Sequence, residues 1–265
     1  MRAHLVQMDI VWEDRAANHA LVERMLDPVD IRAGDLVVLP ELFDVGFSLN
    51  LEAAPDKADE TLRFLLRLAD DLGVTIHGSR AVRRCDCDKA LNTVLVAAPG
   101  DGEGAVLCEY AKVHPFSYGR EPESYTGGQR VEMYDWASGD ERLRVCPAVC
   151  YDLRFPELFR IGAMRGAECF ALGANWPAAR QAHWRALLIA RAIENQAVVF
   201  GVNRVGNDPF IEYAGGTIAV SAKGEVLGEL GDAAGVLTVE VDPGAVRSWR
   251  ETFPALKDVR LREIR

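Results

Sequence analysis

Residues 145–157 read V-C-P-A-V-C-Y-D-L-R-F-P-E, and this stretch guides the interpretation of the rest of the chain. An apolar run of β type, Val145 to Val149, ends abruptly at Cys150, and a charged stretch of helical period follows from Asp152. In α/β sheets, ligands and reacting groups gather where the carboxyl end of a strand meets the amino end of a helix. The helix dipole there would favour the thiolate, the nucleophilic form of cysteine. A buried structural cysteine is the alternative that this stretch alone leaves open.

The composition is that of an ordinary globular protein, since 49% of the 265 residues are hydrophobic and 26% are charged. Predicted helices and strands alternate in both halves of the chain, and no Ser-, Pro- or Gly-rich linker separates them. We therefore expect one α/β domain over residues 1–265, with residues 249–265 as a C-terminal tail.

Charge and hydropathy exclude two classes of partner. The formal net charge of −10 argues against nucleic acid, because binding to a phosphate backbone needs clustered Lys and Arg. The longest stretches without a charged residue, 90–100 and 169–179, fall short of the ~18 apolar residues of a membrane span. The first 25 residues lack the apolar core of a signal peptide, so we expect a cytoplasmic protein without a membrane partner.

The cysteines do not have the spacing of a metal or disulfide framework. They are Cys85, Cys87, Cys108, Cys146, Cys150 and Cys169. No two of these cysteines have the C-x-x-C spacing of zinc sites, and no cluster of His and Cys accompanies them. We expect reduced thiols, no metal and no organic cofactor.

Hydrophobic periodicity predicts the order of the elements. Strands are expected over residues 3–10, 36–40, 74–82, 90–98, 104–112, 145–149, 169–175, 197–203, 215–221, 226–230 and 235–241. Helices are expected over residues 13–26, 59–71, 154–165 and 180–196. Residues 114–130 have no sustained period, which is typical of a lid or a binding loop.

Three chemically useful residues stand at the ends of apolar strands: Glu41, Lys112 and Cys150. If these strands neighbour one another in one sheet, the three side chains converge on one crevice. A base, a cation and a nucleophile in a crevice suffice for acyl transfer. A papain-like pairing of the cysteine with His114 or His183 stays open, although the spacing does not support it.

Four motifs resemble the nitrilase superfamily of carbon–nitrogen hydrolases, in the order of that family. They are L-P-E-L-F-D-V-G-F (39–47), Y-A-K-V-H-P-F (110–116), C-Y-D-L-R-F-P-E (150–157) and A-N-W-P-A-A-R-Q-A-H-W-R-A-L-L-I-A-R-A-I-E-N-Q (174–196). The chain is most similar to the omega-amidases, which hydrolyse the terminal amide of 2-oxoacid amides such as 2-oxoglutaramate and 2-oxosuccinamate. The resemblance implies a four-layer α-β-β-α sandwich. It also implies a homodimer or larger assembly, for which residues 180–196 and 253–256 are our candidate contacts.

The resemblance also assigns catalytic roles. It makes Glu41 the general base, Lys112 the oxyanion-stabilising cation and Cys150 the nucleophile. Glu121 matches the second glutamate of the family, which orients the lysine and the reacting group of the substrate. Glu123 lies close enough in sequence to be the alternative.

Three further residues are expected to bind the substrate. The backbone N–H of Tyr151 would assist Lys112 at the oxyanion. Arg154 matches the arginine that binds the far carboxylate of the oxoacid in the family, and a helix-start salt bridge with Glu157 or Asp152 is the alternative. Trp176 would form a wall for the substrate chain, or else be an ordinary core aromatic.

Together these features predict a cofactor-independent amidase that hydrolyses a small 2-oxoacid omega-amide through a cysteine thioester. Another amidase of the superfamily, acting on an N-carbamoyl amine or a short aliphatic amide, is the alternative within enzymes. A nitrile substrate is disfavoured, because true nitrilases usually carry a different pattern after the cysteine. A silent scaffold of the same fold has no chemical need for all three of Glu41, Lys112 and Cys150.

Overall fold

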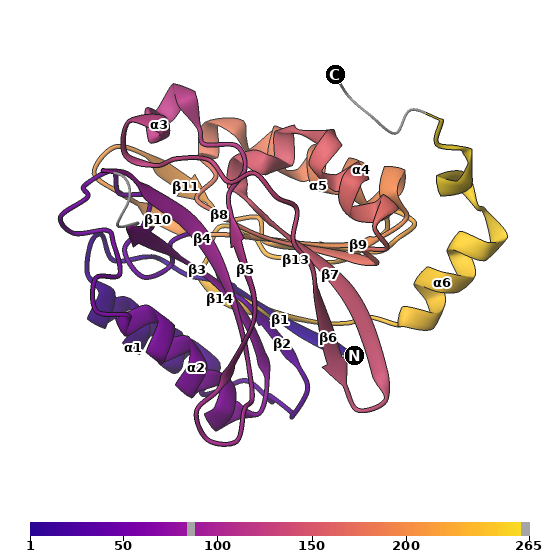
Figure 1. Cartoon of the computed structure of the whole chain (residues 1–265), viewed down its shortest axis with the longest axis horizontal. Coiled ribbons are helices and arrows are strands. Elements are labelled where there is room, and N and C mark those ends of the chain that lie inside the picture. Colours follow the sequence, from indigo (N-terminus) through magenta and orange to yellow (C-terminus); the bar gives the residue numbers. More distant parts are fainter. Residues whose placement is uncertain (84–87, 261–265) are drawn as a thin grey trace.

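A computed structural model describes residues 1–83 and 88–260. Two six-stranded sheets face each other, and helices cover their outer faces, as Figure 1 shows. The chain therefore has the predicted four-layer α-β-β-α sandwich. Cys85, Cys87 and residues 261–265 of the expected tail lie outside the described residues.

The strands of each sheet come from one half of the chain, apart from one strand. The first sheet has the order β14 (Gly235–Glu240), β1 (Arg2–Gln7), β2 (Leu36–Val38), β3 (Thr75–Arg83), β4 (Ala90–Ala98) and β5 (Ala105–Ala111). The second has the order β13 (Val226–Glu229), β12 (Ile218–Val220), β9 (Val198–Asn203), β8 (Cys169–Ala174), β7 (Glu141–Val149) and β6 (Tyr134–Ser138). The short strands β10 (Val205–Asn207) and β11 (Glu212–Ala214) pair separately.

Four helices form the outer layers (Figure 1). Helices α1 (Arg15–Leu26) and α2 (Glu60–Leu72) cover the first sheet, and α4 (Pro156–Met164) and α5 (Gln181–Asn195) cover the second. The predicted end of α2 is confirmed, because Gly73 follows it with φ 68°, a backbone conformation that glycine adopts without strain. A further helix, α6 (Pro243–Thr252), follows β14 and includes the first residues of the expected tail.

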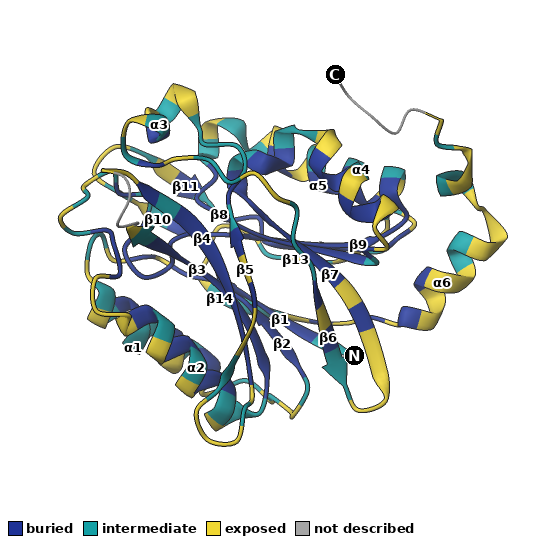
Figure 2. Ribbon diagram, in the orientation of Figure 1, coloured by how far each residue is buried: buried dark blue, intermediate teal, exposed yellow. Residues whose placement is uncertain are grey.

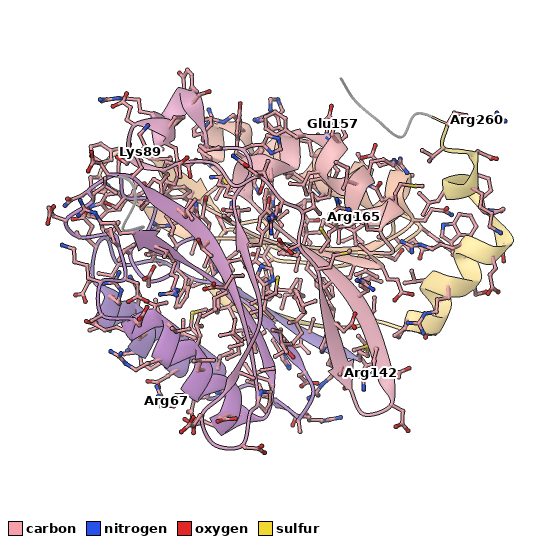
Figure 3. All side chains as sticks on the ribbon, in the orientation of Figure 1. Arg67, Lys89, Arg142, Glu157, Arg165 and Arg260 are labelled. Carbon is pink, nitrogen blue, oxygen red and sulfur yellow. The ribbon has the colours of Figure 1, made fainter. Side chains whose placement is uncertain are left out.

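The core lies between the sheets and beneath the helices (Figure 2). All three residues of β2 and all six of β8 are buried. A strand covered on both faces needs apolar residues at successive positions, which is why these strands appear as continuous apolar runs in the sequence. Charged side chains, including those of Arg67, Arg142 and Glu157, extend from the outer surface (Figure 3). No helix of the described residues is long and apolar enough to cross a membrane.

The strands that precede the three chemically useful residues do not all lie in one sheet, so the condition under which the sequence predicted their convergence is not met. Strands β2 and β5 belong to the first sheet, where β3 and β4 separate them, and β7 belongs to the second. The residues therefore converge across the interface between the sheets.

The helix expected from Arg154 starts two residues later. Residues Cys150–Arg154 form a short 3-10 helix, η2, and α4 begins at Pro156 after the extended Phe155. Proline suits the first position of a helix, because it has no N–H to leave unpaired and it restricts the preceding residue to extended geometry.

Candidate active site

Cys150 occupies a strained position directly after β7. Its φ of 42° is one that residues with a side chain seldom adopt, and such strain is often found at functional sites. The carboxylate of Asp152 closes this turn by accepting hydrogen bonds from the backbone N–H of Val149 (3.0 Å) and the hydroxyl of Tyr110 (2.7 Å). Strand end, turn and buried carboxylate together hold the sulfur in place.

The carboxylate of Glu41 is held by three neighbours. Its Oε1 accepts hydrogen bonds from Nζ of Lys112 and Nδ2 of Asn92, each at 2.8 Å. Its Oε2 accepts one from the backbone N–H of Asn175 at 3.0 Å. All four residues are buried, so this carboxylate has a single well-defined orientation.

Lys112 lies between two carboxylates. Its Nζ is 2.8 Å from Glu41 Oε1 and 2.8 Å from Glu121 Oε2. Glu121 also accepts the backbone N–H of Phe116 at 2.5 Å, which fastens the loop over the lysine. Glu123, the alternative in the sequence, instead forms an exposed ion pair with Arg120. The structure therefore brings Glu121 to Lys112.

The charges in this cluster depend on burial. Burial raises the pKa of the Cys150 thiol well above its usual range, and Glu41 raises it further through its charge and a hydrogen bond. Burial opposes the charge of Lys112, but Glu121 and Glu41 outweigh it and raise the pKa of the lysine. Burial likewise raises the pKa of Glu121, which Lys112 only partly offsets.

These surroundings favour the thiol form of Cys150, against the thiolate that a helix dipole alone would favour. The helix that starts at Cys150 is a 3-10 turn of five residues, too short for a large dipole. Burial beside a carboxylate outweighs it.

Glu41→Gln is expected to lower the pH midpoint for alkylation of Cys150 by iodoacetamide by roughly one unit, because a neighbouring negative charge is removed. Peptide mapping by mass spectrometry across a pH series measures this midpoint for Cys150 alone. Glu123→Gln, which removes an exposed charge paired with Arg120, is the control and should leave the midpoint in place. An unchanged or higher midpoint in Glu41→Gln would contradict the assignment.

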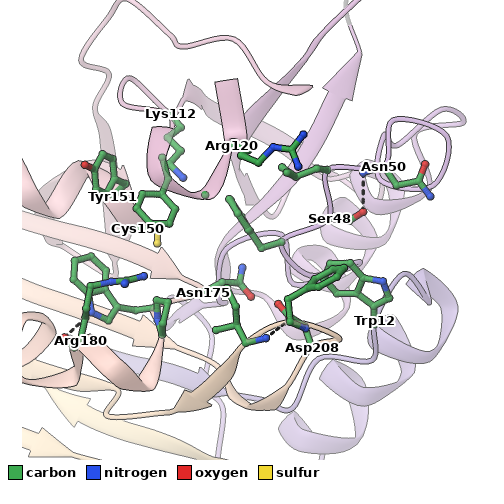
Figure 4. A pocket seen from close by; sticks show the side chains of 18 of the residues that line it. Trp12, Ser48, Asn50, Lys112, Arg120, Cys150, Tyr151, Asn175, Arg180 and Asp208 are labelled. Carbon is green, nitrogen blue, oxygen red and sulfur yellow. Dashed lines mark hydrogen bonds between the residues drawn. The ribbon is translucent and has the colours of Figure 1, made fainter. Parts of the chain in front are cut away.

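The cluster opens into a pocket of about 440 Å³ (Figure 4), whose lining includes Lys112, Cys150, Tyr151, Arg154 and Trp176. This volume suits a small organic ligand. Five residues predicted from the sequence therefore line one pocket. Glu41 and Glu121 contact Lys112, which is one of them.

Arg154 does not form the salt bridge that was its alternative. Its guanidinium carbon lies 4.8 Å from the ring centroid of Trp176, and its N–H groups lie 3.4 Å from Nδ1 of His183. Asp152 is engaged elsewhere, and Glu157 is exposed at the surface. Among residues 1–83 and 88–260, no carboxylate pairs with Arg154.

Trp176 has both roles that the sequence allowed. It is 2% exposed, and its ring lies 5.5 Å from that of Trp184 in the core, yet it lines the pocket. The two histidines lie elsewhere. His114 binds Asp152 at 2.8 Å and stacks on Phe155, and neither His114 nor His183 lines the pocket.

Sequence reasoning missed three residues of this region, Asn92, Asn175 and Arg180. Asn92 carries a signal that could have identified it, since a buried amide within the apolar strand β4 needs hydrogen-bond partners. Asn175 lies inside a recognised motif and binds Glu41 through both its backbone and its side chain. Arg180 lies in the same motif, but an arginine directly before a helix is common and did not by itself indicate a place in the pocket.

Comparison with known proteins agrees with this geometry. The sequence model of the carbon-nitrogen hydrolase family matches residues 2–251. The chain is 36% identical to the omega-amidase YafV of Yersinia enterocolitica over 97% of this chain and 96% of that protein. It is 33% identical to the 2-oxoglutaramate amidase of Bacillus subtilis strain 168, over 96% of each chain.

A solved structure gives the same answer. XC1258 from Xanthomonas campestris, a CN-hydrolase superfamily protein with an arsenic adduct in its active site, superposes with a TM-score of 0.89 at 34% identity, covering 100% of this chain and 99% of that one. With this match of sequence and fold over nearly its whole length, the chain belongs to the carbon–nitrogen hydrolases of the nitrilase superfamily, in an omega-amidase-like branch, and is a hydrolase that acts on amides.

Proposed function

We propose that this hydrolase cleaves the terminal amide of a small 2-oxoacid omega-amide, of the 2-oxoglutaramate or 2-oxosuccinamate type, to the acid and ammonia. The reaction proceeds through a thioester on Cys150 and uses no cofactor. The observation that carries the proposal is the contact of a buried thiol, a carboxylate and an ammonium at a pocket that also holds the unpaired guanidinium of Arg154.

The first half-reaction forms the thioester. Glu41 accepts the proton of the Cys150 thiol as the sulfur attacks the amide carbonyl, which avoids a free thiolate in this buried site. Lys112 has three N–H donors. They contact one oxygen of Glu41 and both oxygens of Glu121, and the charge of the ammonium stabilises the oxyanion together with the backbone N–H of Tyr151. Glu41 returns the proton to the leaving nitrogen, and ammonia departs.

The second half-reaction regenerates the enzyme. Glu41 takes a proton from a water molecule, and the oxygen of that water attacks the thioester carbonyl. The carbon–sulfur bond then breaks, the sulfur recovers a proton, and the free acid leaves. The rigid hydrogen bonds from Asn92, Asn175 and Lys112 keep the carboxylate aligned for both steps.

Arg154 supports the choice of an oxoacid substrate. A guanidinium without a carboxylate partner, held against Trp176, is well placed to bind the far carboxylate of the substrate in a bidentate manner. The omega-amidase and the 2-oxoglutaramate amidase named above add support from related sequences.

The test is ammonia release across a panel of 2-oxoglutaramate, 2-oxosuccinamate, glutamine, an N-carbamoyl amine and an aliphatic nitrile. We expect kcat/KM to be highest for the two 2-oxoacid amides, because only these combine a primary amide with an oxoacid end for Arg154. A higher kcat/KM for the N-carbamoyl amine or the nitrile would refute this substrate class.

We also propose that the enzyme acts in the cytoplasm as a homodimer or larger assembly. Exposed apolar side chains on the outer helices support a contact there: Ile161 and Met164 on α4, Ile193 on α5, and Phe253 after α6. Burying such side chains between two copies would remove apolar surface from water.

A further inference from the structure

The charges of the pocket are not balanced. Three arginines line it, Arg120, Arg154 and Arg180. Arg120 is neutralised by Glu123, which it binds through two hydrogen bonds of 2.8 and 2.7 Å. Within the described ranges 1–83 and 88–260, no Asp or Glu oxygen comes within 4.0 Å of the guanidinium nitrogens of Arg154 or Arg180. Two cations of this pocket therefore lack a counter-charge.

Two acids line the pocket, Glu13 and Asp208, and neither forms an ion pair with Arg154 or Arg180. Glu13 accepts hydrogen bonds from the hydroxyl of Ser48 at 2.5 Å and from the side-chain amide of Asn50 at 3.4 Å. Asp208 accepts hydrogen bonds from the backbone N–H groups of Phe210 and Ile211, both at 2.7 Å, and so caps its own loop. In Figure 4, Arg180 and Cys150 lie toward one end of the pocket, and Trp12 and Asp208 lie toward the other. The end with the reactive sulfur is the cationic one.

Arg180 is positioned by aromatic faces rather than by hydrogen bonds. Its guanidinium carbon lies 5.5 Å from the ring centroid of Phe116 and 6.0 Å from that of Tyr118. Its backbone carbonyl accepts the indole N–H of Trp176 at 2.9 Å, the same ring that Arg154 covers. Contact with ring faces leaves the in-plane N–H donors free, and no acceptor binds them within the described part of the chain. Both arginines thus flank Trp176 with donors to spare.

We propose that Arg180 is a second anion-binding residue for the oxoacid end of the substrate, and that it makes the enzyme prefer 2-oxoacid amides to 2-amino acid amides. This inference rests on the proposed function and deepens it. A carboxylate with an adjacent oxo group presents three acceptor oxygens, more than the two that one guanidinium binds in a bidentate manner. The ammonium of glutamine accepts no hydrogen bond and would meet two uncompensated cations, so binding of glutamine is opposed by repulsion.

The substitution Arg180→Gln tests this. We expect kcat/KM for 2-oxoglutaramate to fall about tenfold to hundredfold, mainly through KM, because a charge-assisted hydrogen bond is lost. The ratio of kcat/KM for 2-oxoglutaramate to that for glutamine should fall with it, since the repulsion of the ammonium is also reduced. Arg180→Lys keeps the charge but not the forked donors. It should retain part of the kcat/KM for 2-oxoglutaramate and part of the preference over glutamine. Arg185→Gln is the matched control, because Arg185 lies on helix α5, which begins directly after Arg180, and pairs with Glu229 at the surface.

A second measurement does not depend on turnover. Alkylation of Cys150 by neutral iodoacetamide is followed while 2-oxoglutarate or glutamate is added as a protecting ligand. In the unaltered chain 2-oxoglutarate should protect at much lower concentration than glutamate. Arg180→Gln should raise the protecting concentration of 2-oxoglutarate about tenfold or more, when protection is measured relative to the alkylation rate of the same variant without ligand.

Three results would overturn the inference: an unchanged substrate ratio, unchanged protection, or an equal loss of kcat and alkylation rate for every reagent. An equal loss of kcat and alkylation rate would mean that Arg180 only supports the Phe116–Tyr118 segment. In that case Arg180→Met, which keeps the apolar part of the side chain, would restore activity. Failure of the proposed function has a different signature, since the unaltered chain would release no ammonia from 2-oxoacid amides while the protection experiment still reports on Arg180.

Discussion

Cys150→Ala is expected to reduce amide hydrolysis by about five orders of magnitude or more, because the thioester cannot form without the sulfur. The fold should be retained, since the substitution removes a single sulfur atom from a small side chain. Ammonia release measures the first effect, and circular dichroism with thermal unfolding measures the second. Trapping of substrate as a thioester, seen as a mass increase on Cys150 in the unaltered chain, should also disappear.

Cys146→Ala is the matched control for this substitution. Cys146 lies on the same strand, β7, and is fully buried, but its thiol faces the core near Gly162 and does not line the pocket. The Cys146→Ala variant should be slightly less stable than the unaltered chain and should keep its activity. Substantial hydrolysis by Cys150→Ala, or equal losses in the two variants, would remove Cys150 from the mechanism.

Lys112→Met is expected to have the second largest effect, on both activity and stability. The substitution removes the donor to the oxyanion, which should lower kcat at least about a hundredfold. It also leaves Glu41 and Glu121 buried without their cation, at a cost of about 3–5 kcal/mol in the free energy of unfolding. Ammonia release and chemical denaturation measure the two losses.

The stability loss in Lys112→Met should depend on pH. Without the ammonium, burial and repulsion by Glu41 raise the pKa of Glu121 still further above its ordinary 4.5. Between that value and the raised one, the folded state binds more protons than the unfolded state, so the free energy of unfolding falls as the pH rises. The deficit relative to the unaltered chain should therefore be smaller at pH 5 than at pH 8.

Lys57→Met provides the comparison, since Lys57 is exposed and pairs with the exposed Glu52. Its loss should change the free energy of unfolding by less than about 1 kcal/mol at either pH. Equal free energies of unfolding for Lys112→Met and Lys57→Met at pH 8 would contradict the pairing of Lys112 with the buried carboxylates of Glu41 and Glu121.

Local patterns predicted most of the regular elements. Strands β4 and β8 were evident because continuous apolar runs reflect burial on both faces, and α2 because its apolar side chains share one face. Strand β6 was missed, since Y-D-W-A-S lies at a sheet edge and exposes polar side chains. Helix α6 was missed because it buries few residues and begins with Pro-Gly.

The candidate site was predictable to the extent that its residues lie at the ends of elements or within recognised motifs. Glu41, Lys112 and Cys150 each follow an apolar strand, which is a local feature. The partners of Glu41 are not local, since Asn92 lies in the first sheet and Asn175 directly follows β8 of the second. The position of the Arg180 guanidinium depends on its contacts with the rings of Phe116 and Tyr118, which lie about sixty positions earlier in the chain.

The amino-acid sequence by itself determined the family, the alternation of helices and strands, and the kinds of chemical group that stand at strand ends, because all of these depend on residues near one another in the chain. Tertiary structure alone decided that the carboxylate and ammonium come from one sheet and the sulfur from the other. It also decided that burial and Glu41 raise the pKa of the Cys150 thiol, and that Glu121 rather than Glu123 reaches Lys112. The physical reason is that burial, charge proximity and hydrogen bonding are properties of packed surfaces, and these surfaces exist only once the two sheets close on each other.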